Sequence, residues 1–134
     1  MDQSSAMVDA KHVILVVDDD VAVRSSLKFT LEVEGFEVRA YSNAGDLLDD
    51  GSLGTADCLV TDYQMPAMNG LELVARLRDR HMQIPAILVT SFPNENVRNC
   101  AAAAGVSIVE KPVLGSRLLD SISKAIDEHS KLSS

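Results

Sequence analysis

Residues 59–73 read LVTDYQMPAMNGLEL, and this stretch decides the fold. A short apolar strand ends at Asp62, and Pro66 and Gly70 then break the chain as turn residues do. Apolar residues recur at helical spacing from Leu71 onward, which predicts an amphipathic helix. A strand followed directly by a helix is the repeating unit of a parallel sheet.

The same unit recurs on both sides of this stretch. Strands are predicted over 12–17, 36–40, 57–61, 84–90 and 106–109. Helical periodicity follows each of them, with the last helix carrying Leu118, Ile122 and Ile126 on one face. The alternation predicts an α/β fold, a doubly wound parallel sheet of five strands with five helices in the flavodoxin-like order 2-1-3-4-5. We expect one domain over 11–129, a flexible N-terminal tail over 1–10, and a tail or the start of a linker over 130–134.

Composition narrows the class of protein. The 134 residues carry 12 Lys and Arg against 20 Asp and Glu, a net charge of −8, and this excludes a free-standing nucleic-acid binder and disfavours anionic membranes. No apolar run reaches the roughly 18 residues of a membrane span, and the N-terminus lacks the features of a secretion signal. A cytoplasmic location is expected. Cys58 and Cys100 lie far apart and predict neither a disulfide nor a zinc site.

Polar side chains stand at the carboxyl ends of four predicted strands. Asp18 and Asp19 follow the first, Asp62 the third, Thr90 the fourth and Lys111 the fifth. Ligands of doubly wound sheets bind at this edge. Carboxylates that meet there repel one another unless a cation joins them. Oxygen ligation with room for water and a phosphate oxygen is typical of Mg²⁺, and Mn²⁺ can substitute.

Each of these residues also has an ordinary structural explanation. Acidic residues before a helix cap its free amides, an aspartate or threonine is common where a strand ends, and a lysine is usually a solvated charge. The combination of acid, acid, hydroxyl and amine at successive strand ends is harder to explain that way. Together they could perform phosphoryl transfer, with the Asp62 carboxylate attacking phosphorus while Lys111 and Thr90 contact the phosphoryl oxygens.

The segments VVDDD, LVTDYQMPAMNGLEL, PAILVTS and EKP, taken in order, resemble the receiver domain of two-component response regulators over about residues 11–129. The resemblance implies that Asp62 accepts a phosphoryl group from a sensor histidine kinase or phosphotransfer protein. It implies that Asp19, Asp18 partly through water, Asp62 and the main-chain carbonyl of Gln64 hold Mg²⁺. It also implies that Lys111 contacts the phosphate and that Thr90 turns toward it.

The resemblance further implies a signalling switch that is not an enzyme in its own right but catalyses its own phosphorylation and dephosphorylation. Occupancy would switch a surface made by the helix that Asn94 begins, the fifth strand and the last helix, and phosphorylation can bring two copies together. No direct nucleic-acid contact by this domain is implied. Ile108 stands where the family usually has an aromatic switch residue, and the Lys111–Pro112 peptide bond is usually cis.

Three other functions compete with this interpretation. A phosphatase of the dehalogenase type also uses an aspartate and magnesium, but its D-x-D-x-[TV] motif would need Thr or Val where Ala22 stands. A flavodoxin-like binder of small molecules would need a glycine or Ser/Thr phosphate cradle after the first strand. A degenerate receiver that acts only as an interaction module would lack the acceptor or the lysine. The cognate kinase and any output domain stay open.

Overall fold

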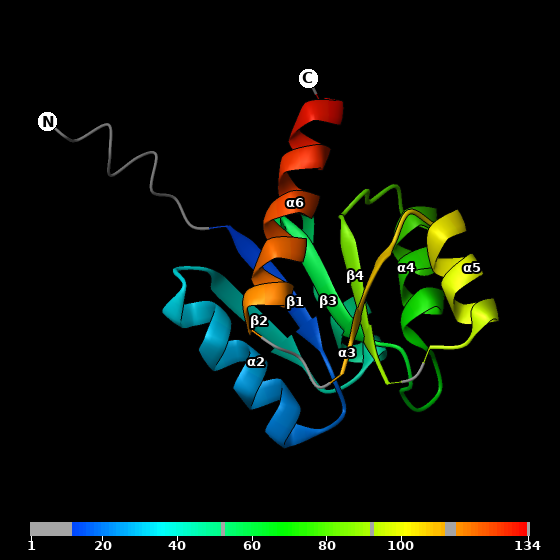
Figure 1. Cartoon of the computed structure of the whole chain (residues 1–134), viewed down its shortest axis with the longest axis horizontal. Coiled ribbons are helices and arrows are strands. Elements are labelled where there is room, and N and C mark those ends of the chain that lie inside the picture. Colours follow the sequence, from blue (N-terminus) through cyan, green and yellow to red (C-terminus); the bar gives the residue numbers. More distant parts are fainter. Residues whose placement is uncertain (1–11, 52, 92, 112–114, 134) are drawn as a thin grey trace, which may run out of the picture.

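A computed structural model describes residues 12–51, 53–91, 93–111 and 115–133. Five parallel strands form one sheet in the order β2-β1-β3-β4-β5, which confirms the predicted topology (Figure 1). The strands are β1 (Val13–Val17), β2 (Glu37–Tyr41), β3 (Cys58–Asp62), β4 (Ala86–Thr90) and β5 (Ser107–Glu110). Strands β1 and β3 are direct neighbours, so the residues that follow them share one edge of the sheet.

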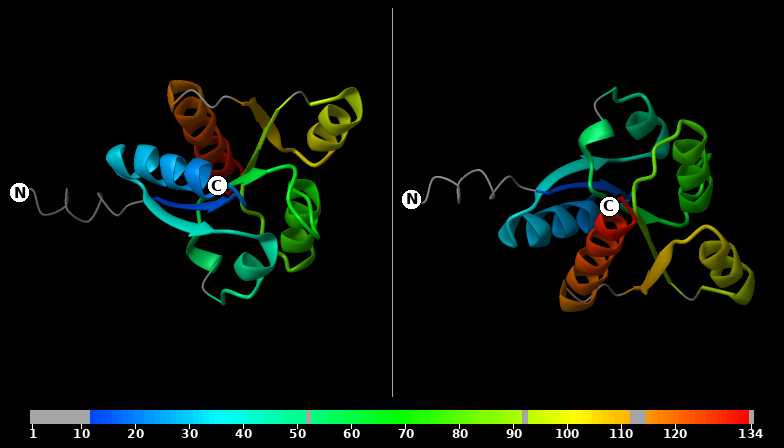
Figure 2. Two further views of the ribbon diagram at one scale, coloured as in Figure 1. Left: turned by 90° about the horizontal axis from the view of Figure 1, so that it is seen from below. Right: turned by 90° about the horizontal axis from the view of Figure 1, so that it is seen from above.

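Helices cover both faces of the sheet (Figure 2). They are α2 (Val21–Val33), α3 (Ala44–Leu48), α4 (Gly70–Asp79), α5 (Glu95–Ala103) and α6 (Gly115–Ser133). The apolar sides of α2 and α6 pack on one face, and those of α3, α4 and α5 pack on the other. The sheet is therefore the middle of three layers, as a doubly wound fold requires.

The central strands are apolar on both faces because both faces are covered. Successive residues of β1 enter opposite cores: Leu15 packs with α3, α4 and α5, whereas Ile14 packs with α2 and α6. Both side chains are fully buried. This explains why the sequence shows continuous apolar runs in place of the alternation of a half-exposed strand.

Helix ends follow the sequence signals. Asn43 and Asn94 are N-caps whose side chains accept hydrogen bonds from backbone amides of α3 and α5. Asp20 caps α2 by accepting from the amides of the second and third helical residues. Gly35 and Gly105 end α2 and α5 with positive φ angles of 98° and 71°, the backbone region that favours glycine. Of the three consecutive acids Asp18, Asp19 and Asp20, the last therefore has the ordinary role of a helix cap.

Two features of the chain differ from the sequence prediction. A short 3₁₀ helix over Leu53–Thr55, which was not predicted, precedes β3. Helix α6 runs to Ser133, so the backbone at 130–133 is helical, where a tail or the start of a linker was predicted. No glycine or proline follows Gly115, so nothing in the sequence stops this helix earlier.

Several predictions fall outside the described residues. These are the flexible tail over 1–10 and the peptide bond to Pro112. In the part of the chain that is described, none of the helices combines the length and apolarity needed to cross a bilayer.

Candidate functional site

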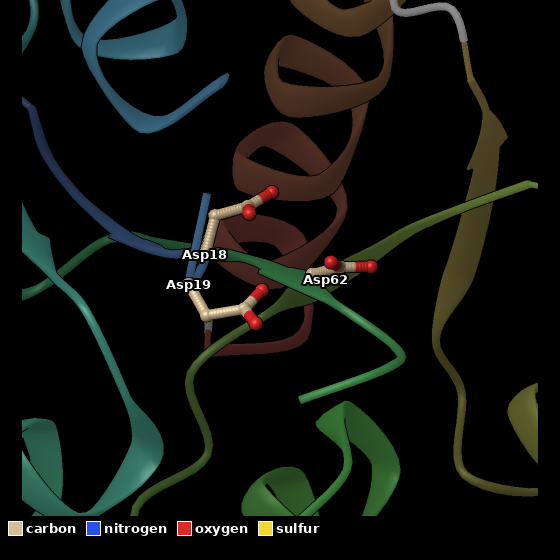
Figure 3. A group of neighbouring side chains, drawn as sticks. All are labelled: Asp18, Asp19 and Asp62. Atoms are coloured by element: carbon tan, nitrogen blue, oxygen red, sulfur yellow. The ribbon is translucent and has the colours of Figure 1, made fainter. Parts of the chain in front are cut away.

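Three carboxylates meet at the carboxyl ends of β1 and β3 (Figure 3). Asp18 and Asp19 follow β1 directly, and Asp62 is the last residue of β3. One oxygen of each carboxylate lies within 4.8 Å of the other two. The acidic residues that the sequence predicted to meet at this edge therefore do lie together in the structure.

Asp18 is the buried member of the group, with only 1% of its surface exposed. Its Oδ1 accepts a hydrogen bond from the amide of Asp20 at 2.9 Å. Its Oδ2 is buried and has no hydrogen-bond partner among the described residues. The nearest cation to Oδ2 is the Nζ of Lys111 at 3.8 Å, an ion-pair distance that is too long for a hydrogen bond.

The protonation of Asp18 reflects this environment. Burial raises the pKa of the Asp18 carboxyl above its ordinary value, and the negative charge of Asp62 raises it further. The hydrogen bond from the Asp20 amide and the charge of Lys111 oppose that rise. The site thus holds a buried acid that its protein neighbours do not fully compensate.

Asp62 is paired with Lys111, which follows β5 at the same edge of the sheet. The Nζ of Lys111 donates to Oδ2 of Asp62 at 3.3 Å, and Asp62 is only 7% exposed. The lysine follows β5, and its amide donates to the carbonyl of Thr90 at 2.9 Å. This last backbone hydrogen bond between the two strand ends therefore fixes the position of Lys111 where the chain leaves the sheet.

Thr90 and Gln64 border the group. Thr90 is buried at the end of β4, and its hydroxyl donates to the carbonyl of Ser91 at 3.4 Å. Gln64 lies in the loop after β3, where its amide faces Oδ1 of Asp62 at 3.4 Å. The structure therefore gathers the three acids and Lys111, while the Thr90 hydroxyl faces the backbone of the next residue, Ser91.

The loop after β3 folds tightly against the end of that strand. Gly70 is the first residue of α4, and its amide donates to the carbonyl of Tyr63 at 3.0 Å. A Cβ at Gly70 would stand 2.5 Å from the carbonyl oxygen of Asp62 and 2.7 Å from a methyl carbon of Leu88. The glycine is therefore required by close approach to the Asp62 backbone, a more specific reason than the turn role predicted from sequence.

Sequence reasoning missed Arg24, which contacts the site through the main chain. Its Nη1 donates to the carbonyl oxygen of Asp18 at 2.6 Å. A signal was available, because a cation in the first turns of a helix opposes the helix dipole and so suggests a specific partner.

The residues present fit a divalent cation. The donor set consists of carboxylate oxygens, which Mg²⁺ prefers over softer ligands. The unpartnered, buried Oδ2 of Asp18 marks a place where positive charge is needed. The exposed carboxylate of Asp19 leaves the group open to solvent on one side.

Residues 14–123 match the family described as the response regulator receiver domain. The cyclic di-GMP phosphodiesterase response regulator RpfG of Xanthomonas campestris pv. campestris is 40% identical over 106 residues, covering 75% of this chain and 28% of RpfG. The transcriptional regulatory protein FixJ of Bradyrhizobium diazoefficiens is 34% identical over 114 residues, covering 84% of this chain and 56% of FixJ. This chain thus spans between about a quarter and a little over half of these relatives.

Solved structures agree with the sequence relatives. The crystal structure of a response regulator receiver domain protein from Clostridium thermocellum matches with a TM-score of 0.82 at 26% identity, covering 90% of this chain and 98% of that chain.

Proposed function

This chain belongs to the response regulator receiver domain family, and on that premise we propose that it is a phospho-accepting switch whose acceptor is Asp62. The observation that carries the proposal is the environment of the Asp62 carboxylate. It is nearly buried, it accepts a hydrogen bond from Lys111, and it stands within 4.8 Å of two further acids. An acid placed only for fold stability has no need of two neighbouring carboxylates.

The proposed donor is a phosphohistidine on a sensor histidine kinase or phosphotransfer protein. A carboxylate oxygen of Asp62 attacks phosphorus and forms the O–P bond of an acyl phosphate. The N–P bond of the donor breaks, and the imidazole nitrogen leaves with the electron pair and takes up a proton from water. Hydrolysis later returns the carboxylate and inorganic phosphate.

The other residues of the site support this reaction by charge and position. Bound Mg²⁺, held by Asp18, Asp19, Asp62 and the Gln64 carbonyl, would neutralise charge on the phosphoryl oxygens. Lys111 would pair with a phosphoryl oxygen in place of its present bond to Asp62. The hydroxyl of Thr90, which lies one strand away, would turn from the Ser91 carbonyl toward the phosphate.

The proposed output surface lies on α5, β5 and α6. The Lys111 amide is bonded to Thr90, so a movement at either residue reaches β5 directly. Arg98 of α5 pairs with Glu110 of β5 at 2.9 Å, which links the helix to the same strand. Ile108, on β5, is half-buried and packs against the core under α3, α4 and α5. We include pairing of two phosphorylated copies through this surface in the proposal.

Intact-mass analysis after incubation with acetyl phosphate tests the proposal, with and without Mg²⁺. We expect the parent chain to gain one phosphoryl group only when Mg²⁺ is present, and Asp62→Asn to gain none. The matched control is Asp79→Asn, which removes one carboxylate from the exposed end of α4 and should label like the parent. No gain by the folded parent chain with any donor would contradict phosphotransfer and favour an interaction module.

A further inference from the structure

Arg24 ties together the loop that carries two of the three acids. We propose that Arg24 is a positioning residue that fixes the Asp18–Asp20 loop for divalent-cation binding, an inference that rests on the proposed function. Arg24 is half-buried on α2. It touches the loop twice, through different groups.

The two contacts hold the carbonyl groups on either side of Asp19. The Nη1 of Arg24 donates to the carbonyl of Asp18 at 2.6 Å. The backbone amide of Arg24 donates to the carbonyl of Asp20 at 2.9 Å. The side chain of Arg24 therefore fixes the peptide group before Asp19, and its amide makes the first helical hydrogen bond to the peptide group after Asp20. The Asp19 side chain stays exposed.

Asp18 makes two further hydrogen bonds that do not involve Arg24. The Asp18 amide donates to the carbonyl of Tyr41 at 3.2 Å, and the Asp18 side chain accepts from the Asp20 amide at 2.9 Å. The carbonyl of Asp18 is the one polar group of this residue that a side chain from α2 holds. If that bond is lost, the loop can rotate about Asp19, and the geometry of the two carboxylates is no longer fixed.

A positioning role and a charge role predict opposite results. The guanidinium is a positive charge bonded to a residue of an acidic site, and by Coulomb repulsion alone its removal should tighten the binding of a cation. Partners that orient metal ligands without touching the metal typically contribute 10- to 100-fold to affinity. If Arg24 positions the loop, its removal should therefore weaken cation binding.

The experiment measures the dissociation constant for Mn²⁺ by electron paramagnetic resonance of the free ion, using the full chain. We expect Arg24→Gln to raise the dissociation constant about 10-fold. The matched control is Lys28→Gln, which removes the same charge from the same helix. Among the described residues, the ion pair of Lys28 is with Glu32, at 4.0 Å. This control should leave the dissociation constant unchanged or lower it slightly.

An unchanged or lower dissociation constant for folded Arg24→Gln would overturn the inference. Far-UV circular dichroism establishes folding. If Arg24→Gln fails to fold, Arg24→Lys replaces it, because the lysine keeps the charge but its nitrogen ends one bond short of Nη1; a raised dissociation constant is again expected. Failure of the parent chain itself to bind Mn²⁺ would instead contradict the metal site of the proposed function, so the two failures are distinct.

Discussion

An aspartate at the amino end of the sheet and one at the carboxyl end differ in their hydrogen bonding. At the amino end, Oδ2 of Asp57 accepts from the amide of Val13 at 2.8 Å and lies 3.5 Å from Nδ1 of His12. At the carboxyl end, Oδ2 of Asp18 is buried with no hydrogen-bond partner among the described residues. Strand amides that point out of the amino end can satisfy an acid, whereas the carboxyl end offers carbonyl groups, which cannot donate. The difference separates an acid that stabilises the fold from acids that are left available for a ligand.

The largest expected effect comes from filling the space at Gly70 on the carboxyl end. Gly70→Ala should lower the free energy of unfolding by about 2 to 3 kcal/mol, because the new Cβ would overlap the Asp62 carbonyl oxygen and overpacking costs this much. Urea unfolding measures it.

Gly54→Ala, in the 3₁₀ helix before β3, is the amino-end control for Gly70→Ala. A Cβ at Gly54 meets nothing within 4 Å, so the expected change is below about 0.5 kcal/mol. A gain in stability for Gly70→Ala, as helix propensity alone predicts, would show that close approach does not hold this position.

Removal of each acid tests the comparison directly. Asp57→Ala should destabilise the fold by about 1.5 kcal/mol, because the Val13 amide loses its acceptor. Asp18→Asn in metal-free buffer should stabilise it by about 1 kcal/mol, because a buried charge is removed while an oxygen remains for the Asp20 amide. Thermal unfolding with EDTA provides both values. Equal signs for the two variants would contradict the contrast between the two ends.

The pH dependence of the stability gained by Asp18→Asn sharpens the comparison. The pKa of Asp18 in the folded chain is raised above its ordinary value of 3.8, so between these two values the folded state binds more protons than the unfolded state. The stability of the parent chain attributable to Asp18 therefore falls as pH rises through this window and is constant above it. With EDTA, the advantage of Asp18→Asn should be near zero at pH 3, grow as pH rises and then level off. An advantage that is already complete at pH 3 would show that charge is not its cause.

The smallest expected effects lie at two strained residues, one at each end. Ala67, in the loop after β3, has a φ of 71°, and His81, between α4 and β4, has a φ of 64°. Glycine should raise the free energy of unfolding by about 1 kcal/mol at position 67 and about 0.5 kcal/mol at position 81, since histidine tolerates this region better than alanine. Differential scanning calorimetry resolves both. A loss of stability at either position would mean that the native side chain makes contacts worth more than its strain.

Most of the fold could be predicted because its signals are local. Fully buried strands appear as continuous apolar runs, and Asn43 and Asn94 mark helix starts by accepting hydrogen bonds from amides three residues away. Strict alternation of strands and helices predicted a doubly wound parallel sheet, and 2-1-3-4-5 is one of the two common strand orders of that fold. The sequence did not determine where α6 ends, because a polar C-terminal segment without glycine or proline is compatible with both helix and tail.

The sequence could predict only those site residues whose position is determined by the end of a strand. Asp18, Asp62 and Lys111 follow predicted strands, so topology alone brings them together. The partner of Arg24 is a backbone carbonyl, which has no sequence signature. The direction of the Thr90 hydroxyl depends on its side-chain rotamer. Gly70 is needed because a Cβ there would lie 2.5 Å from the carbonyl oxygen of Asp62. Such contacts can be recognised only in the three-dimensional structure.

The pairing of Lys111 with Asp62 joins residues 49 positions apart, across two intervening helices and β4. Such a contact forms only when the edge strand β5 has docked, so Asp62 is paired with Lys111 only in the completed domain. No peptide around Asp62, and no fragment ending before β5, would carry the pair. Through recombination and gene duplication, this arrangement can therefore be inherited as a whole domain but not transferred as a short motif.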